Sequence, residues 1–241
     1  KSDFIYILNK SIYYNDITDG AFDVTVKPLV ELWGFGVSGL QDAIPSDEHI
    51  KNALSQMGLD NIIINNNYLH KINEINIDFS AIAKGYAVDK ISSYLNKINI
   101  QNHMVEIGGE LKVSGLNLDG SRWIIGIQNP SEDAVSPFLN ISLTDRGMAT
   151  SGNYRNYYTI KGKRYAHIIS PKTGRPIENT ILSVTVISDN CLDSDALATA
   201  LMVMDTDEGL ELIEKIEDTE AFYYLENDKF LYSSGFKNFI Q

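Results

Sequence analysis

Asp195 and Thr199 stand four positions apart in SDNCLDSDALATALMVM, residues 188–204. In a helix, positions i and i+4 lie on one face, so this pair can present a carboxylate and a hydroxyl to the same point. Oxygen ligands of this kind suit a hard cation such as magnesium. The alternative is that Asp193 or Asp195 caps the helix and complements its dipole. Spacing alone favours the capping interpretation.

A second candidate segment, IDFSAIAKGYAVDKISSYL, runs from residue 77 to residue 95. It places Asp78, Ser80 and Lys84 near the start of a predicted amphipathic helix. Exposed amides at a helix N-terminus bind anions, and the Lys84 ammonium can neutralise a phosphate. Gly85 permits the close approach of another backbone or of a ligand. The alternative is that Asp78 or Ser80 caps the helix while Lys84 is solvated.

His167 is the histidine in the most polar context. It stands at the end of a predicted strand, inside the glycine- and aromatic-rich segment 149–179. Pro171 and Gly174 follow it and predict a turn, and functional residues concentrate on such connections. The other three histidines lie in less polar surroundings. We therefore rank His167 first as a functional histidine.

The pattern of elements predicts an α+β fold with antiparallel sheet and packed helices, in one domain over residues 1–241. Predicted helices cover 1–16, 25–33, 47–57, 81–97, the apolar part of 188–204, and 206–216. Segments 61–67 and 68–74 predict a hairpin with an Asn-rich turn, and the strand pattern continues to Ser80. Further strands are expected within 104–115, 123–130, 138–151, 157–171 (with a tight turn at 161–163), 181–189, 221–226 and 229–234.

Composition narrows the class of partner. The chain has 241 residues, 44% of them hydrophobic, and a net charge of −12, which disfavours nucleic acid and anionic lipid surfaces. The single cysteine, Cys191, excludes an internal disulfide and a cysteine-based zinc site. No apolar run approaches the ~20 residues that span a bilayer. Because the first residue is Lys1, we expect a processed or truncated piece of a longer protein.

Two sets of short motifs point elsewhere and are rejected. GFGVSG at 34–39 matches a dinucleotide-binding fingerprint, but it follows a predicted helix instead of a strand. KTG at 172–174, SDN at 188–190 and SGFK at 234–237 match the three boxes of penicillin-recognising serine enzymes. These boxes occur in reversed chain order, with Ser234 near the C-terminus. A serine hydrolase is therefore a weak competitor.

Six segments in order carry a family resemblance: DGAFDVTVKPLVELWGFG, IDFSAIAKGYAVDKI, VEIGGEL, ATSGNYRNYY, YAHIISPKTGRPI and DSDALATALMVM. Together they resemble the ApbE family of magnesium-dependent FAD:protein FMN transferases. The resemblance implies a T-fold-related α+β domain that cleaves the pyrophosphate of FAD. It also implies transfer of FMN through a phosphoester bond to a threonine of an acceptor flavoprotein of the redox-pump subunit type, with release of AMP.

The resemblance also implies roles for individual residues. FAD would be bound by Ala21, Phe22, Asp23, Asp78, Lys84, His167 and Ile168. Mg²⁺ would be held by the backbone carbonyl of Ala81 and the side chains of Asp195 and Thr199. For the proton of the acceptor threonine, His167 and Asp195 are the two candidate bases.

Three further expectations follow from the same resemblance. Family members carry an additional N-terminal segment that contributes to the FAD site, so we expect that segment to be missing from this chain. The family is commonly exported and tethered as a lipoprotein, which predicts a membrane-anchored protein facing outside the bacterial cytoplasm. The alternative functions are hydrolysis of FAD to FMN and AMP, in which water replaces the threonine, and a non-catalytic flavin-binding carrier.

Overall fold

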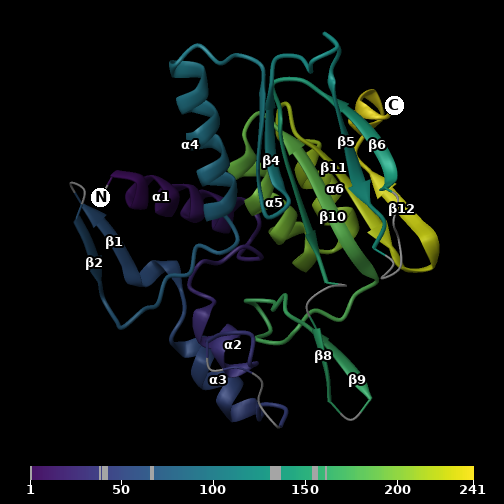
Figure 1. The fold of residues 1–241 in the computed structure, drawn as a ribbon. Coiled ribbons are helices and arrows are strands. Elements are labelled where there is room, and N and C mark those ends of the chain that lie inside the picture. The colour runs from purple at the N-terminus through teal and green to yellow at the C-terminus, as the bar shows by residue number, and fades with distance from the viewer. Residues whose placement is uncertain are drawn as a thin grey trace. The chain divides into compact units, whose positions relative to one another are not determined.

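The computed structural model describes residues 2–37, 39, 43–65, 68–130, 137–153, 157–160 and 162–241. Figure 1 shows the ribbon of the chain. The chain divides into two compact units. The first unit comprises Lys1–Ala81 and Asn156–Asn179, and the second comprises Ile82–Arg155 and Thr180–Gln241. The expectation of one domain over 1–241 stays a prediction.

The first unit combines helices with two small hairpins. The helices are α1 (Ser2–Ile17), α2 (Lys27–Leu32), α3 (Asp47–Ser55) and the 3-10 turn η1 (Leu59–Asn61); the antiparallel hairpins pair β1 (Ile62–Asn65) with β2 (Tyr68–Lys71) and β8 (Tyr157–Ile160) with β9 (Lys163–Ala166). Helix α3 begins after Ser46, whose hydroxyl accepts a hydrogen bond from the His49 amide, a standard N-cap. The apolar core of this unit contains Leu29, Trp33, Ile50, Ala53, Tyr165 and Ile169.

The second unit is built on a six-stranded antiparallel sheet in the order β12-β11-β10-β7-β4-β3. Its strands are β3 (His103–Ile107), β4 (Glu110–Ser114), β7 (Gly147–Gly152), β10 (Ile181–Ser188), β11 (Glu220–Leu225) and β12 (Lys229–Tyr232). The unit also contains the hairpin β5 (Trp123–Gln128) with β6 (Pro137–Leu143), the helices α4 (Ala83–Lys97), α5 (Cys191–Val203) and α6 (Thr206–Ile213), and the 3-10 turns η2 (Glu226–Asp228) and η3 (Phe236–Phe239).

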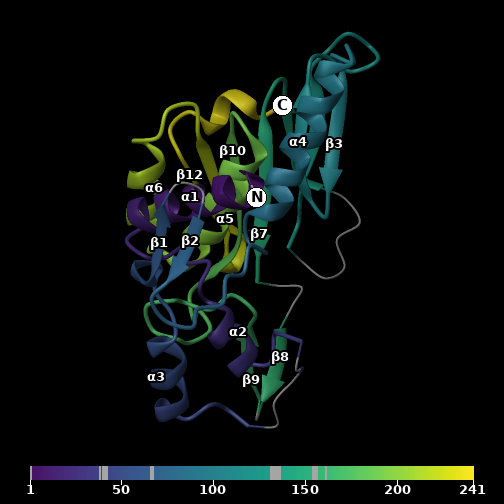
Figure 2. The ribbon, with the colours of Figure 1, turned by 90° about the vertical axis from the view of Figure 1, so that its left-hand side faces the viewer.

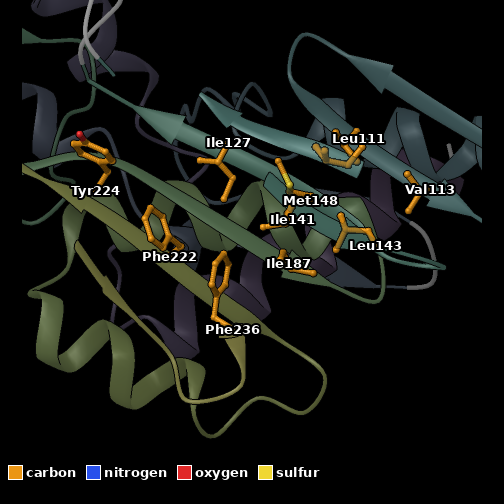
Figure 3. Close-up of a cluster of buried hydrophobic side chains, with 11 residues drawn as sticks. Leu111, Val113, Ile127, Ile141, Leu143, Met148, Ile187, Phe222, Tyr224 and Phe236 are labelled. Atoms are coloured by element: carbon orange, nitrogen blue, oxygen red, sulfur yellow. The ribbon is translucent and has the colours of Figure 1, made fainter. Parts of the chain in front are cut away.

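One face of this sheet carries the main apolar core. Leu111, Met148 and Ile187 are register partners across β4, β7 and β10, so their side chains lie in one row. They pack with residues of the β5–β6 hairpin and of β11, and Figure 3 shows the resulting cluster. Phe222 on β11 stacks on Phe236, with ring centroids 5.3 Å apart. Burial of this cluster fixes which face of each strand points inward.

The opposite face of the sheet receives the helices. Helix α5 packs on β7 and β10, while α4 packs on α5, β3 and β4 (Figures 1 and 2). Because side chains alternate along a strand, the neighbours of the core row point to this helical face. Glu110, which precedes Leu111, pairs with a residue of α4, and Ser151, three residues after Met148, bonds to a residue of α5. The alternation of side chains along β4 and β7 therefore places Glu110 and Ser151 on the face that contacts α4 and α5.

The observed elements confirm most of the predicted ones, including all six helices within a few residues of their expected ends. The continued strand pattern through Ser80 was wrong. The amide of Asp78 makes an isolated hydrogen bond of 2.7 Å to the carbonyl of Val24, and the segment 74–79 adopts no strand. The expected Asn-rich turn includes residues 66 and 67, and the expected tight turn includes residue 161; these three lie outside the described residues. Among the described helices, none is long and apolar enough to cross a membrane.

Candidate functional site

Helix α5 is capped by Asn190, and Asp195 has no part in the cap. The Asn190 side chain accepts a hydrogen bond of 2.9 Å from the Asp193 amide. Asp195 is the fifth residue of the helix, beyond the first turn where orphan amides need acceptors. The interpretation of Asp193 or Asp195 as the cap, which spacing favoured, is therefore wrong. The residue that caps α5 is Asn190, which directly precedes the first residue of the helix.

Asp89 on α4 completes the N-terminus of α5. Its carboxylate accepts hydrogen bonds from the amides of Cys191 at 2.9 Å and Leu192 at 2.8 Å. Burial raises the pKa of Asp89, although both amides act in the opposite direction. A side chain of one helix thus supplies acceptors for the first turn of the next. Because Asn190 and Asp89 accept the hydrogen bonds of the amides in the first turn of α5, Asp195 is not needed to cap α5.

The Asp195 side chain is buried, with 2% of the residue exposed, and it faces α4. Its Oδ2 accepts a hydrogen bond of 2.9 Å from the amide of Gly85. Burial raises the pKa of Asp195 to about 6, against the opposing effects of the Gly85 amide and the Lys84 ammonium. A buried carboxylate is poorly solvated, so either a neighbouring cation stabilises its charge or it takes up a proton.

Gly85 is required for this contact because the two helices approach closely. An added Cβ would lie 2.7 Å from the carbonyl carbon of Cys191 and 2.8 Å from the Cα of Leu192. Real Cβ atoms do not tolerate such distances to backbone, so any side chain would push α5 away from α4. The expectation that Gly85 permits the close approach of another backbone is confirmed.

Thr199 lies one turn after Asp195 on the same helix, as the spacing predicted. Its Oγ1 is 3.2 Å from Oγ of Ser151 on β7, within hydrogen-bond distance. Ser151 can therefore orient the Thr199 hydroxyl, which must direct a lone pair toward any cation that it binds.

Lys84 forms an ion pair with Glu110 at the start of β4. The Lys84 side chain is 43% exposed, whereas that of Glu110 is only 5% exposed. A buried carboxylate therefore anchors an ammonium that still reaches solvent. Its exposure leaves the Lys84 ammonium accessible to a phosphate, and the phosphate role of Lys84 stays a prediction.

The start of α4 differs from the prediction. The helix begins at Ala83, and its N-cap residue Ile82 makes no side-chain cap. Asp78 instead accepts a hydrogen bond of 2.8 Å from the Ser80 amide in the preceding loop. Capping of α4 by Asp78 or Ser80 was therefore wrong. Ala81 lies in the turn just before the helix.

In the first unit, Ala21, Phe22 and Asp23 form a loop held by local bonds. The Phe22 carbonyl accepts from the Asn15 side chain at 2.8 Å, and Ala21 and Phe22 are buried. Asp23 accepts from both the amide and the hydroxyl of Thr25 at 2.7 Å. Burial raises the pKa of Asp23. The adjacent Val24 carbonyl receives the Asp78 amide, so two of the predicted FAD segments meet in this unit.

His167 and Ile168 follow β9 in the same unit. The carbonyl of buried Ile168 accepts a hydrogen bond of 3.0 Å from the Ile177 amide. Gly174 lies in the turn between these two residues, and its carbonyl accepts a hydrogen bond of 2.8 Å from the indole N–H of Trp33. His167 is half-buried, and its ring meets that of Phe35 edge-on with centroids 6.3 Å apart. The predicted turn after His167 is confirmed.

Residues of the rejected motifs take part in structural contacts. GFGVSG follows α2, a helix, as expected. Lys172 of KTG pairs with Asp19 at 2.5 Å, and Asn190 of SDN is the α5 cap. The Ser234 hydroxyl donates to Glu214 at 2.7 Å. None of these contacts resembles an activated serine.

Comparison with known proteins gives the same family as the motifs. The model of the ApbE family matches residues 1–223. This chain belongs to the ApbE family. It is 44% identical over 237 residues to the FAD:protein FMN transferase of Vibrio cholerae. The matched region covers 97% of this chain and 71% of that protein. The Haemophilus influenzae protein of the same name is 41% identical over 222 residues, covering 89% of this chain and 64% of that protein.

Solved ApbE structures confirm the predicted α+β fold class. The structure called flavin transferase ApbE from Vibrio cholerae matches with a TM-score of 0.90 at 42% identity. It covers 99% of this chain and 77% of that chain. This chain therefore spans roughly two thirds to three quarters of the lengths of these ApbE relatives.

The donor set of the predicted ApbE metal site fits a hard cation. Asp195 offers a carboxylate and Thr199 a hydroxyl, and both are oxygen donors on one helix face. Among the described residues there is no group of three His, Cys, Asp or Glu side chains suited to a metal. The ligand set of Asp195, Thr199 and the carbonyl of Ala81 stays a prediction.

Sequence reasoning missed three residues around this ApbE helix pair. Asp89, Glu110 and Ser151 each contact one of the predicted residues or its helix. Glu110 lies within VEIGGEL and Ser151 within ATSGNYRNYY, so both stood in segments already selected. For Glu110 and Ser151, the signal that could have found them is the alternation of side chains along a strand, which places both residues on the helical face of the sheet.

Proposed function

We propose that this chain transfers FMN from FAD to a threonine of an acceptor flavoprotein through a phosphoester bond, with release of AMP. By family resemblance, Mg²⁺ would be held by the side chains of Asp195 and Thr199 and by the carbonyl of Ala81. The names of the relatives support the transfer of FMN from FAD. The observation that carries the metal site is the buried Asp195 carboxylate, which sits inside α5 and bonds the Gly85 amide next to Lys84.

The bond changes in this reaction balance without a further reactant. The threonine oxygen forms a bond to the phosphorus of the FMN half, and the bond from that phosphorus to the bridging oxygen breaks. The electron pair leaves on the phosphate of AMP. The acceptor proton goes to a base, for which His167 and Asp195 are the candidates.

Charge neutralisation is the main task of the protein groups. Bound Mg²⁺ supplies Lewis-acid stabilisation of the negative charge that develops on the phosphate oxygens. The Lys84 ammonium neutralises a further phosphate oxygen, and its ion pair with Glu110 limits its freedom. The Ser151 hydroxyl lies within hydrogen-bond distance of Thr199, so Thr199 can donate its proton there and direct a lone pair to the cation.

The remaining predicted residues bind the substrate. Ala21, Phe22 and Asp23 form the FAD-binding loop together with Asp78, and His167 and Ile168 contact the cofactor. The bond from Asp78 to Val24 supports this assignment, because it joins both segments in one unit. By family resemblance, the acceptor is a redox-pump subunit and the enzyme is a membrane-anchored lipoprotein outside the bacterial cytoplasm.

Incubation of the protein with FAD, Mg²⁺ and an acceptor flavoprotein tests the proposal. We expect a fluorescent flavin adduct on the acceptor that survives denaturing electrophoresis, and AMP in equal amount. EDTA should abolish both, and an acceptor with its target Thr replaced by Val should stay unlabelled. No adduct on a competent acceptor would overturn the proposal.

The same experiment separates the alternatives. Release of AMP at an undiminished rate when the acceptor is omitted indicates FAD pyrophosphatase activity. Stoichiometric FAD binding with neither AMP nor adduct indicates a flavin carrier.

A further inference from the structure

Glu110 carries a buried oxygen that the proposed reaction has not used. Its Oε1 pairs with the Lys84 ammonium, but among the described residues its Oε2 is buried and has no hydrogen-bond partner. An ionised carboxylate accepts hydrogen bonds only, so Oε2 requires a donor. Leaving a buried charged acceptor unpaired is unfavourable, and such groups are rare in folded proteins. A bound molecule is the expected donor.

The position of Glu110 connects it with the proposed metal ligand. Lys84 and Gly85 are consecutive residues in the first turn of α4. Lys84 pairs with Glu110, and the Gly85 amide donates to Asp195. One dipeptide therefore brings two buried carboxylates, from β4 and α5, to the same turn.

We propose that Glu110 is a positioning residue for the metal, whose Oε2 accepts a hydrogen bond from a water molecule bound to the cation at Asp195 and Thr199. This inference rests on the metal site of the proposed function and adds a residue to it.

The chemistry of magnesium favours a water as the donor. Mg²⁺ releases its waters reluctantly, so it usually keeps several of them beside a few protein ligands. Such waters are strong donors, and a carboxylate outside the coordination shell is a common partner for groups bound to a metal. Two carboxylates against one ammonium also leave the cluster with a negative charge, which attracts a cation.

A titration with Mn²⁺ alone, followed by the EPR signal of the free ion, measures the site without turnover. We expect Glu110→Gln, which keeps the size of the side chain, to weaken Mn²⁺ binding by about 10-fold or more. The control variant Glu208→Gln removes an equal charge from an exposed position on α6 and should leave binding unchanged. Unchanged binding in Glu110→Gln would overturn the inference.

Two further variants separate the hydrogen bond from simpler effects. Glu110→Asp keeps the charge but shortens the side chain, so it should remain weakened; full restoration of affinity would show that charge alone matters. Lys84→Gln removes the ion-pair partner and should bind Mn²⁺ at least as tightly as the unmodified protein. A loss in Lys84→Gln equal to that in Glu110→Gln would mean that Glu110 acts only through Lys84. Circular dichroism establishes that each variant is folded.

Asp195→Asn distinguishes failure of this inference from failure of the proposed function. If Asp195→Asn weakens Mn²⁺ binding and Glu110→Gln does not, the metal site stands and the role of Glu110 is wrong. If neither variant changes the affinity, the metal site of the proposed function is wrong as well.

Discussion

Two pairs of aspartates, one pair in each unit, are held in different ways. In the first unit, Asp23 and Asp78 each bond an amide only two residues further along the chain. In the second unit, Asp89 bonds amides 102 and 103 residues away, and Asp195 bonds one 110 residues away. The first pair shapes loops, whereas the second pair joins two helices.

This difference shows where the geometry of a site is fixed. A carboxylate in an Asx turn follows its own loop and can move with it. A carboxylate that bonds the backbone of another helix has its position set by tertiary packing, which is more rigid. Groups that must meet a metal need the second arrangement. Substitutions in the two sets should therefore have unequal effects.

The largest effect is expected for Asp195→Asn. This change keeps the acceptor for the Gly85 amide but removes the anionic ligand, so FMN transfer should fall by at least about 100-fold. The rate of adduct formation at saturating FAD measures it. Asp193→Asn is the matched control on the same helix, and its activity should stay within a few-fold of the original. Equal losses in both variants would contradict a special role for Asp195.

Gly85→Ala should have the next largest effect. The added methyl group meets the backbone of Cys191 and Leu192, which cannot move without displacing α5. We expect the free energy of unfolding to fall by about 1–3 kcal/mol, as measured by urea denaturation. Ser93→Ala, at an exposed position of the same helix, is the control and should change stability little. A stable Gly85→Ala protein would show that the helix contact is looser than described.

Asp89→Asn should have a smaller effect that depends on pH. An amide presents only one acceptor to the two α5 amides, so we expect a loss of about 1 kcal/mol at neutral pH. The raised pKa of Asp89 means that its carboxyl stabilises the fold most below the ordinary value of 3.8, and this contribution is lost as pH rises through the raised value. The stability gap between the two proteins should therefore widen as pH is lowered from about 7 toward about 4. A gap that is constant with pH would contradict the shift.

Asp78→Asn should have the smallest effect. Asparagine can accept the same hydrogen bond from the Ser80 amide, so stability should change by no more than about 0.5 kcal/mol. Thermal denaturation measures this change. A loss as large as that of Asp89→Asn would remove the distinction between the two sets of carboxylates.

The sequence predicted the helices, the antiparallel sheet and the family, because periodicity and ordered motifs are local or linear signals. Spacing alone favoured Asp195 as a cap, since it could not show that Asn190 and Asp89 already satisfy the α5 amides, and only the family resemblance pointed to Asp195 as a ligand. Asp89 and Glu110 act through contacts between elements that are distant in the chain. Such partners are invisible until the packing of α4 on α5 is known.

The capping of α5 by Asp89 also has a consequence for folding kinetics. Because the partner is 102 residues earlier, the first turn of α5 gains these hydrogen bonds only after a long loop has closed. We therefore expect the first turn of α5 to gain these hydrogen bonds late in folding, when α4 packs on α5. If the proposed cation site is correct, intermediates that lack the contact between α4 and α5 should not bind the cation, so recovery of cation binding during refolding would report the formation of this contact.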